Sequence, residues 1–156
     1  MGERIAADSG LTETQSRTLK ALLNLIIPAD SDRAMPGAGE LDFIGYIKEF
    51  ASDSMAAIHR EIDSLDARLT NELGAGVEEL EERVLEQFVD KLRASEPYFA
   101  VNVVIQAINC YYQDDRVVTA LGWEARPPFP KGFDVVRGDL SLLEPVRQRG
   151  KIYREP

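Results

Sequence analysis

Apolar side chains recur at every third or fourth position over five helical turns in the middle of the sequence, and this pattern constrains the fold most. Residues at that spacing share one face of an α-helix. Ser52 or Asp53 is expected to cap the start of this helix, and Gly74 to end it in the left-handed conformation. An apolar stripe of this length has to be covered by other elements, which predicts a core of packed helices. The stripe consists of Met55, Ile58, Ile62, Leu65, Leu69 and Leu73.

Two helices are predicted before this stripe, with a loop between them. Thr12 and Gln15 have the spacing of a capping box, so the first helix is expected to begin there. Pro28 disfavours helical geometry at the preceding residue and should end this helix near Ile26 or Ile27. Residues 30–39 are rich in Asp, Pro and Gly, which is typical of a loop with turns. The second helix is predicted from the apolar residues Leu41, Phe43, Ile44, Ile47 and Phe50.

Three further helices are predicted after residue 74. The fourth should run from about Val77 to Ala94. The fifth is expected to begin at a Ser95 cap with Pro97 in its first turn, where a missing amide hydrogen costs nothing. The sixth should cover DDRVVTAL and end at Gly122. The faces expected to be buried are Leu80, Val84, Leu85, Phe88 and Leu92 in the fourth helix, and Tyr98, Val101, Val104, Ile105, Ile108 and Tyr112 in the fifth.

Helical periodicity ends after Leu121, and this boundary predicts two parts of a single domain. Residues 1–122 are predicted to form an all-α, antiparallel bundle of five to six helices. Residues 123–156 are predicted to be a long irregular extension that contains five prolines and several aromatic residues. Apolar side chains argue against plain disorder, so the extension should pack either on its own bundle or on another protein. The sequence leaves these two alternatives open.

The charge distribution excludes some classes of partner. The net charge is −9, which argues against nucleic acid, because phosphate binding depends on clustered cations. From Arg126 onward there are seven Lys or Arg and four Asp or Glu, a net of +3, so the first 125 residues carry −12. This asymmetry predicts a basic segment that lies on the acidic body or reaches a partner. Apolar runs are too short for a membrane-spanning helix.

The residue inventory offers little catalytic chemistry. His59 is the only histidine and Cys110 the only cysteine, so the several Cys or His ligands of a zinc site are missing. A calcium loop opening at Asp30 would need glycine where Met35 stands and glutamate where Leu41 stands. We therefore expect no metal, cofactor or catalytic residue in this chain. The alternatives are a small free-standing helical enzyme that uses Cys110 or His59, or a regulatory module.

Two blocks of the sequence resemble the gluconate 2-dehydrogenase subunit 3 family. The first is LKALLNLIIPADSDRAMPGAGELDFIGYI, residues 19–47, where a helix ends in IIPAD and a Pro/Gly loop leads into an apolar helix. The second is YYQDDRVVTALGWEARPPFPKGFDVV, residues 111–136. The segment DLSLLEPVRQRGKIYRE also looks like the tail of such proteins.

The resemblance implies a small accessory subunit of a sugar, polyol or glycoside dehydrogenase. In such complexes the large subunit is an FAD flavoprotein of the glucose–methanol–choline type, and a cytochrome c subunit often accepts the electrons. The small subunit has no redox centre and helps to fold, stabilise or export the flavoprotein. Many relatives carry a twin-arginine export signal, which does not occur here. We expect a cytoplasmic protein, with a removed signal or periplasmic export alongside the partner as the alternatives.

Contacts with the flavoprotein are expected mainly from the extension. Aromatic and arginine side chains dominate the energetics of protein interfaces. The alternative for Trp123 and Phe129 is that they cap their own bundle. The residues predicted to bind the partner are Trp123, Phe129, Pro130, Phe133, Arg147 and Tyr153.

Overall fold

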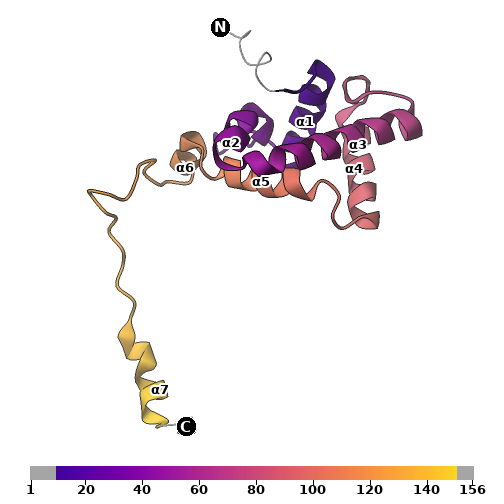
Figure 1. Cartoon of the computed structure of the whole chain (residues 1–156). Helices are drawn as coiled ribbons and strands as arrows, with labels where there is room; N and C mark the ends of the chain where they lie inside the picture. The colour runs from indigo at the N-terminus through magenta and orange to yellow at the C-terminus, as the bar shows by residue number, and fades with distance from the viewer. Residues whose placement is uncertain (1–9, 151–156) are drawn as a thin grey trace. The chain divides into compact units, whose positions relative to one another are not determined.

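The computed structural model of the protein describes residues 10–150, in which the regular structure consists of α-helices and short 3-10 helices (Figure 1). The described residues contain no strand, only an isolated bridge between Asp30 and Met35, so the all-α class is confirmed. The chain divides into a first unit, Met1–Ala125, and a second unit, Arg126–Pro156. The elements are α1 (Glu13–Ile26), η1 (Ala38–Glu40), α2 (Phe43–Phe50), η2 (Ser52–Ser54), α3 (Met55–Leu73), η3 (Val77–Glu79), α4 (Glu82–Ser95), α5 (Val101–Tyr111), α6 (Asp115–Ala120), η4 (Leu140–Leu143) and α7 (Glu144–Gln148).

The ends of α1 and α3 follow the signals read from the sequence. The Gln15 amide donates to Thr12 Oγ1 over 3.2 Å, and the Thr12 amide donates to Gln15 Oε1 over 2.8 Å, which completes the capping box of α1. Gly74 ends α3 at φ 71°, a conformation that glycine adopts without steric cost. The expected caps of α3 are wrong: Ser52 and Asp53 belong to η2, and the N-cap is Ser54 without a side-chain bond.

The loop between α1 and α2 is fixed on both sides. The Gly39 amide donates to Asn24 Oδ1 of α1 over 2.9 Å. A Cβ atom at Gly39 would lie 2.7 Å from the backbone oxygen of Lys20, so only glycine fits there without a shift. On the other side, the hydroxyl of the buried Tyr111 on α5 donates to the Pro36 carbonyl over 2.9 Å. These contacts give the Pro/Gly loop a structural role between two helices.

The region between α3 and α5 differs from the prediction. Val77–Glu79 forms a 3-10 turn, and Leu80 and Glu81 are extended, so α4 begins at Glu82 rather than near Val77. Ser95 is the last residue of α4 rather than the cap of the next helix. Its hydroxyl donates to the carbonyls of Lys91 and Leu92, a use of serine that competes with capping. Pro97 lies in the turn before α5.

The buried face of α5 is also not the predicted one. The helix buries Val103, Ala107, Cys110 and Tyr111, whereas Tyr98, Ile105, Ile108 and Tyr112 are exposed. Residues 97–113 contain no charged side chain, so the apolar pattern could not by itself select a face. Tertiary hydrogen bonds fix the rotation of the helix. Glu61 of α3 accepts hydrogen bonds from the amides of Asn102 and Val103, and Tyr111 bonds to the Pro36 loop.

One hydrophobic core joins the helices of the first unit. In Figure 1, α3 and α5 lie alongside each other with the chain running in opposite directions, and α1 and α4 run across them. An antiparallel bundle of all the helices stays a prediction. No helix within residues 10–150 combines the length and apolar character needed to cross a bilayer. The most deeply buried side chains of the core are Leu22, Ile47, Ile58, Ile62, Leu65, Leu69, Val103, Tyr111 and Val117.

The second unit contains a short helical segment where we expected irregular chain. Asp139 caps it by accepting the Ser141 amide over 2.9 Å, and η4 then leads into α7. Pro145 stands in the first turn of α7, where no amide hydrogen is needed. This segment is too short for its periodicity to have been recognised in the sequence.

Candidate functional site: exposed aromatic residues and an apolar groove

Trp123 lies in the turn that ends α6, two residues after the C-cap Leu121, and its side chain is exposed to solvent. The amide of Gly122, at φ 83°, donates to the Thr119 carbonyl, and the amide of Trp123 donates to the Val118 carbonyl. This pair of bonds is the Schellman ending of a helix. The Trp123 side chain is 75% exposed, although tryptophan usually buries much of its surface.

Phe129, Pro130 and Phe133 lie on one loop at the start of the second unit. Arg126 holds this loop: its guanidinium donates to the carbonyls of Pro127 and Gly132 and lies 4.2 Å from the centroid of the Phe133 ring. The Phe129 side chain is 84% exposed. Arg126 was not among the residues predicted from the sequence, because its bonds to loop carbonyls depend on the three-dimensional turn.

The remaining predicted residues lie further along the chain. Arg147 is on α7 and pairs with Glu144 over 3.6 Å at a mostly exposed position. Tyr153 lies outside the described residues. Trp123 thus belongs to the first unit, one loop of the second unit brings Phe129, Pro130 and Phe133 together, and Arg147 is on a separate helix. Their role in binding a partner stays a prediction.

Cys110 and His59, the residues of the enzymatic alternative, have environments of different kinds. Cys110 is buried in the core on α5, and burial, followed by the nearby carboxylates of Asp114 and Asp42, raises the pKa of its thiol to about 11. The thiol is therefore protonated at neutral pH and is a poor nucleophile. His59 is half-buried on α3. The described residues also include no group of three or more His, Cys, Asp or Glu placed to hold a metal ion.

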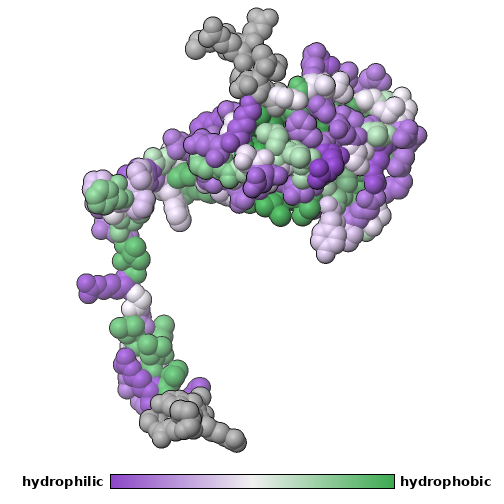
Figure 2. All heavy atoms as spheres, viewed as in Figure 1, coloured by the Kyte–Doolittle hydropathy of each residue, from purple (hydrophilic) through white to green (hydrophobic). Residues whose placement is uncertain are grey.

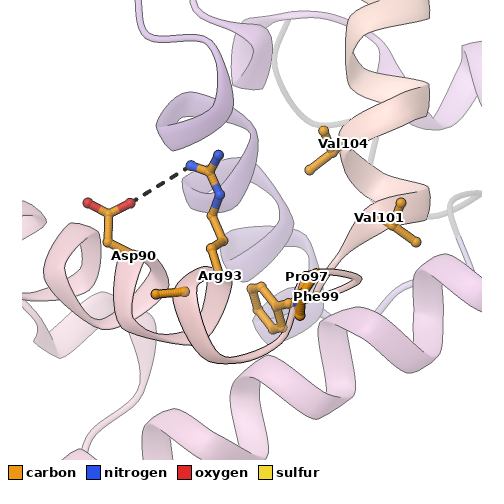
Figure 3. A pocket seen from close by; sticks show the side chains of 7 residues that line it. Asp90, Arg93, Pro97, Phe99, Val101 and Val104 are labelled. Carbon is orange, nitrogen blue, oxygen red and sulfur yellow. Dashed lines mark ion pairs between the residues drawn. The ribbon is translucent and has the colours of Figure 1, made fainter.

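The structure also contains a groove between α1, α4 and α5, lined mostly by apolar side chains, that was not predicted from the sequence. One part has a volume of about 360 Å³, and its floor includes Leu25, Ile26, Val89 and Ile108. An adjoining part of about 460 Å³ is lined by Pro97, Phe99, Val101 and Val104, as Figure 3 shows. The two parts share Asp90, Arg93, Phe99 and Val104.

The rim of this groove is charged. Asp90 and Arg93 of α4 pair over 3.8 Å at its edge, the dashed line in Figure 3. Glu86 lines the groove one turn before Asp90 and has no ion pair among the described residues. The absence of charge in residues 97–113 was the signal that could have identified this surface, because a solvated helix normally carries charged residues on its outer face.

Comparison with known proteins identifies the family. Residues 13–127 match the description of gluconate 2-dehydrogenase subunit 3. The chain belongs to this family. The match covers α1–α6 and Trp123 and ends before Phe129, Pro130 and Phe133. The family is described as a subunit of a dehydrogenase, so a member of the gluconate 2-dehydrogenase subunit 3 family works with protein partners. No curated protein and no solved structure matches the chain.

Proposed function

We propose that this protein is a non-catalytic accessory subunit that binds and stabilises an FAD-dependent oxidoreductase of the glucose–methanol–choline type, one that acts on a sugar, polyol or glycoside. The observation that carries the proposal is the family match over residues 13–127. The FAD would reside in the large partner, and a cytochrome c subunit would be a further partner in some complexes. Helping the flavoprotein to mature is part of the same role. We expect the complex in the cytoplasm, with export alongside the partner as the alternative.

Two features of the structure support a binding role. The thiol of Cys110 is buried and protonated, so it offers no ready nucleophile. Trp123, Phe129 and Phe133 have exposed rings, and exposed aromatic side chains are frequent binding anchors. These rings would contact the flavoprotein. Trp123 lies within the region that matches the family, and Phe129 and Phe133 lie after it.

The test is co-expression of the chain with the flavoprotein encoded in the neighbouring reading frame. Such a partner is recognised by a Gly-x-Gly-x-x-Gly dinucleotide fingerprint. We expect a stable yellow complex and a higher yield of FAD-loaded flavoprotein than without the subunit. A flavoprotein that is equally soluble, loaded and active alone, and never co-purifies with this chain, would contradict the proposal.

The aromatic contacts are tested by a Trp123→Ala, Phe129→Ala double variant. We expect weaker co-purification, by about tenfold or more in Kd, with unchanged helical circular dichroism. Phe50→Ala is the matched control, because this ring is also exposed, at the end of α2. Loss of helical signal in the double variant would instead show that the two rings support their own fold.

A further inference from the structure

We infer that the groove between α1, α4 and α5 is a second docking surface, which receives an apolar segment of the flavoprotein flanked by Lys or Arg side chains. This inference rests on the proposed function and adds a binding surface separate from Trp123 and the second unit. Three observations carry it: the composition of α5, the exposure of its outer face, and the charge on the rim of the groove.

The composition of α5 is uncharged and mostly apolar. It has no charged residue, and residues 97–113 around it have none either. A solvated helix normally carries charged residues on its outer face. The polar side chains of Asn102 and Gln106 are engaged, with Glu61 and with Tyr46 and Ser54, and Asn109 is exposed. The described chain therefore covers one face of α5 and leaves a second, largely apolar face uncovered.

Val101, Val104 and Ile108 line the groove, and Ile105 and Tyr112 extend this face of α5 beyond it. Val101, Val104, Ile105, Ile108 and Tyr112 follow at helical spacing, and the Ile105 and Ile108 side chains are 50% and 43% exposed. Figure 2 shows hydrophobic atoms gathered along the edge of the first unit at which Figure 1 places α5. Exposed apolar side chains gathered on one face in this way favour an interaction site.

The charge on the rim of the groove indicates which kind of segment would bind there. Glu86 and Asp90, one turn apart on α4, line the groove, and Arg93 pairs with Asp90, so Glu86 is the lining carboxylate without an ion pair among the described residues. Glu82, one turn earlier, lies on the same face of α4. Basic side chains on either side of an apolar segment would complement them. A second copy of this chain is disfavoured, because it would bring its own acidic α4 and a first unit with net charge −12 against them. An anionic lipid surface is disfavoured for the same reason.

The first test replaces the exposed apolar positions in the complex. Ile108→Asp and Ile105→Asp are each co-expressed with the flavoprotein, and the Kd of the purified variant is measured by titration. We expect at least tenfold weaker binding for each. Leu73→Asp at the end of α3 is the matched control, because Leu73 is 40% exposed and lies outside the groove. Ile105→Asp, at the more exposed position, serves if Ile108→Asp loses its helical circular dichroism.

The second test reverses the charge on the rim. Glu86→Lys is expected to weaken binding by about tenfold and to reduce the loss of affinity caused by added salt, because an attractive pair across the interface is replaced by a repulsive one. Lys substitution of Glu49, an exposed carboxylate on α2, is the control. Affinity and salt dependence unchanged in Glu86→Lys would overturn the predicted basic partner segment.

The outcomes separate this inference from the proposed function. If the wild-type chain binds the flavoprotein and both isoleucine variants bind as tightly as Leu73→Asp, the groove inference alone fails. If the wild-type chain never binds a flavoprotein, both fail. If gel filtration shows a wild-type dimer that Ile108→Asp splits, the groove belongs to a second copy of this chain, which also overturns the inference.

Discussion

At the scale of single residues, the environment of Cys110 bears on whether this chain has chemistry of its own. A thiol acts as a nucleophile in its ionised form, and enzymes stabilise that form with a nearby positive charge or a helix N-terminus. Cys110 instead lies near the end of α5, with the carboxylates of Asp114 and Asp42 nearby. Both its position and its neighbours favour the neutral thiol.

The resulting prediction is slow thiol modification. A pKa of about 11 leaves roughly one Cys110 thiol in a thousand ionised at about pH 8, against about a quarter for an unperturbed cysteine. We expect the native chain to react with an aromatic disulfide reagent roughly two-hundredfold more slowly than the same chain in denaturant. Cys110→Ala gives the background rate. Rapid stoichiometric labelling of Cys110 in the native chain would contradict this prediction and support the alternative of an enzyme that uses Cys110.

At the scale of elements, α5 depends on a cap supplied by another helix. Its N-cap residue, Ala100, is left-handed at φ 51° and has no side-chain oxygen to accept a backbone amide. Glu61 of α3 performs this role: one carboxylate oxygen accepts the Asn102 amide over 3.1 Å and the other accepts the Val103 amide over 3.0 Å. The contact ties the start of α5 to the middle of α3 and fixes which face of α5 is buried.

We therefore predict that Glu61→Ala destabilises the fold by about 1–3 kcal/mol, measured by urea unfolding. The substitution leaves two half-buried amides without their acceptor. Glu61→Gln should cost less, because its amide oxygen can still accept one bond. Glu72→Ala is the control on the same helix: Glu72 pairs with Lys91 at an exposed position over 3.5 Å, and its loss should cost at most ~0.5 kcal/mol. Equal effects for Glu61→Ala and Glu72→Ala would contradict the capping role.

A comparison of α5 with α1 and α3 shows which parts of the fold could be predicted from the sequence. The capping box at Thr12 and the end at Gly74 were predictable, because each depends on a few neighbouring residues. The start of α5 was not, because Ser95 can either cap a helix or bond to the carbonyls of the previous turn. Its buried face depends on Glu61, which lies 41 residues earlier in the chain. Because the groove includes that unburied face, it too was beyond local pattern reasoning.

At the scale of the whole molecule, acidic side chains are crowded on the first unit. Its net charge of −12 is larger in magnitude than the −9 of the full chain. Burial and then Asp63 raise the pKa of Asp66, although a hydrogen bond from Thr18 opposes them. Self-repulsion of this kind destabilises a compact state. The ion pairs among the described residues lie mostly at exposed positions, where each contributes little.

We predict that salt stabilises the isolated chain. Raising NaCl from about 20 to about 150 mM shortens the screening length and weakens the repulsion. If the free energy of unfolding rises by about 1 kcal/mol, the melting temperature should rise by roughly 2–4 °C. Circular dichroism at a helical wavelength gives the measurement. A melting temperature that falls with salt would mean that attractive ion pairs outweigh the repulsion.

Glu86 connects this repulsion to the proposed docking surface. It has no ion pair among the described residues and shares its face of α4 with Glu82 and Asp90. Arg93 offsets the charge of Asp90, so in the isolated chain Glu82 is the like charge that mainly opposes Glu86. Glu86→Gln should therefore raise the melting temperature at low salt while weakening the complex with the flavoprotein. A solvent-exposed residue with no role in binding would not raise the melting temperature and lower the affinity together. A charge that serves a partner stabilises the complex at the expense of the free subunit. If Glu86→Gln instead lowers the melting temperature and leaves the affinity unchanged, Glu86 serves the fold of this chain.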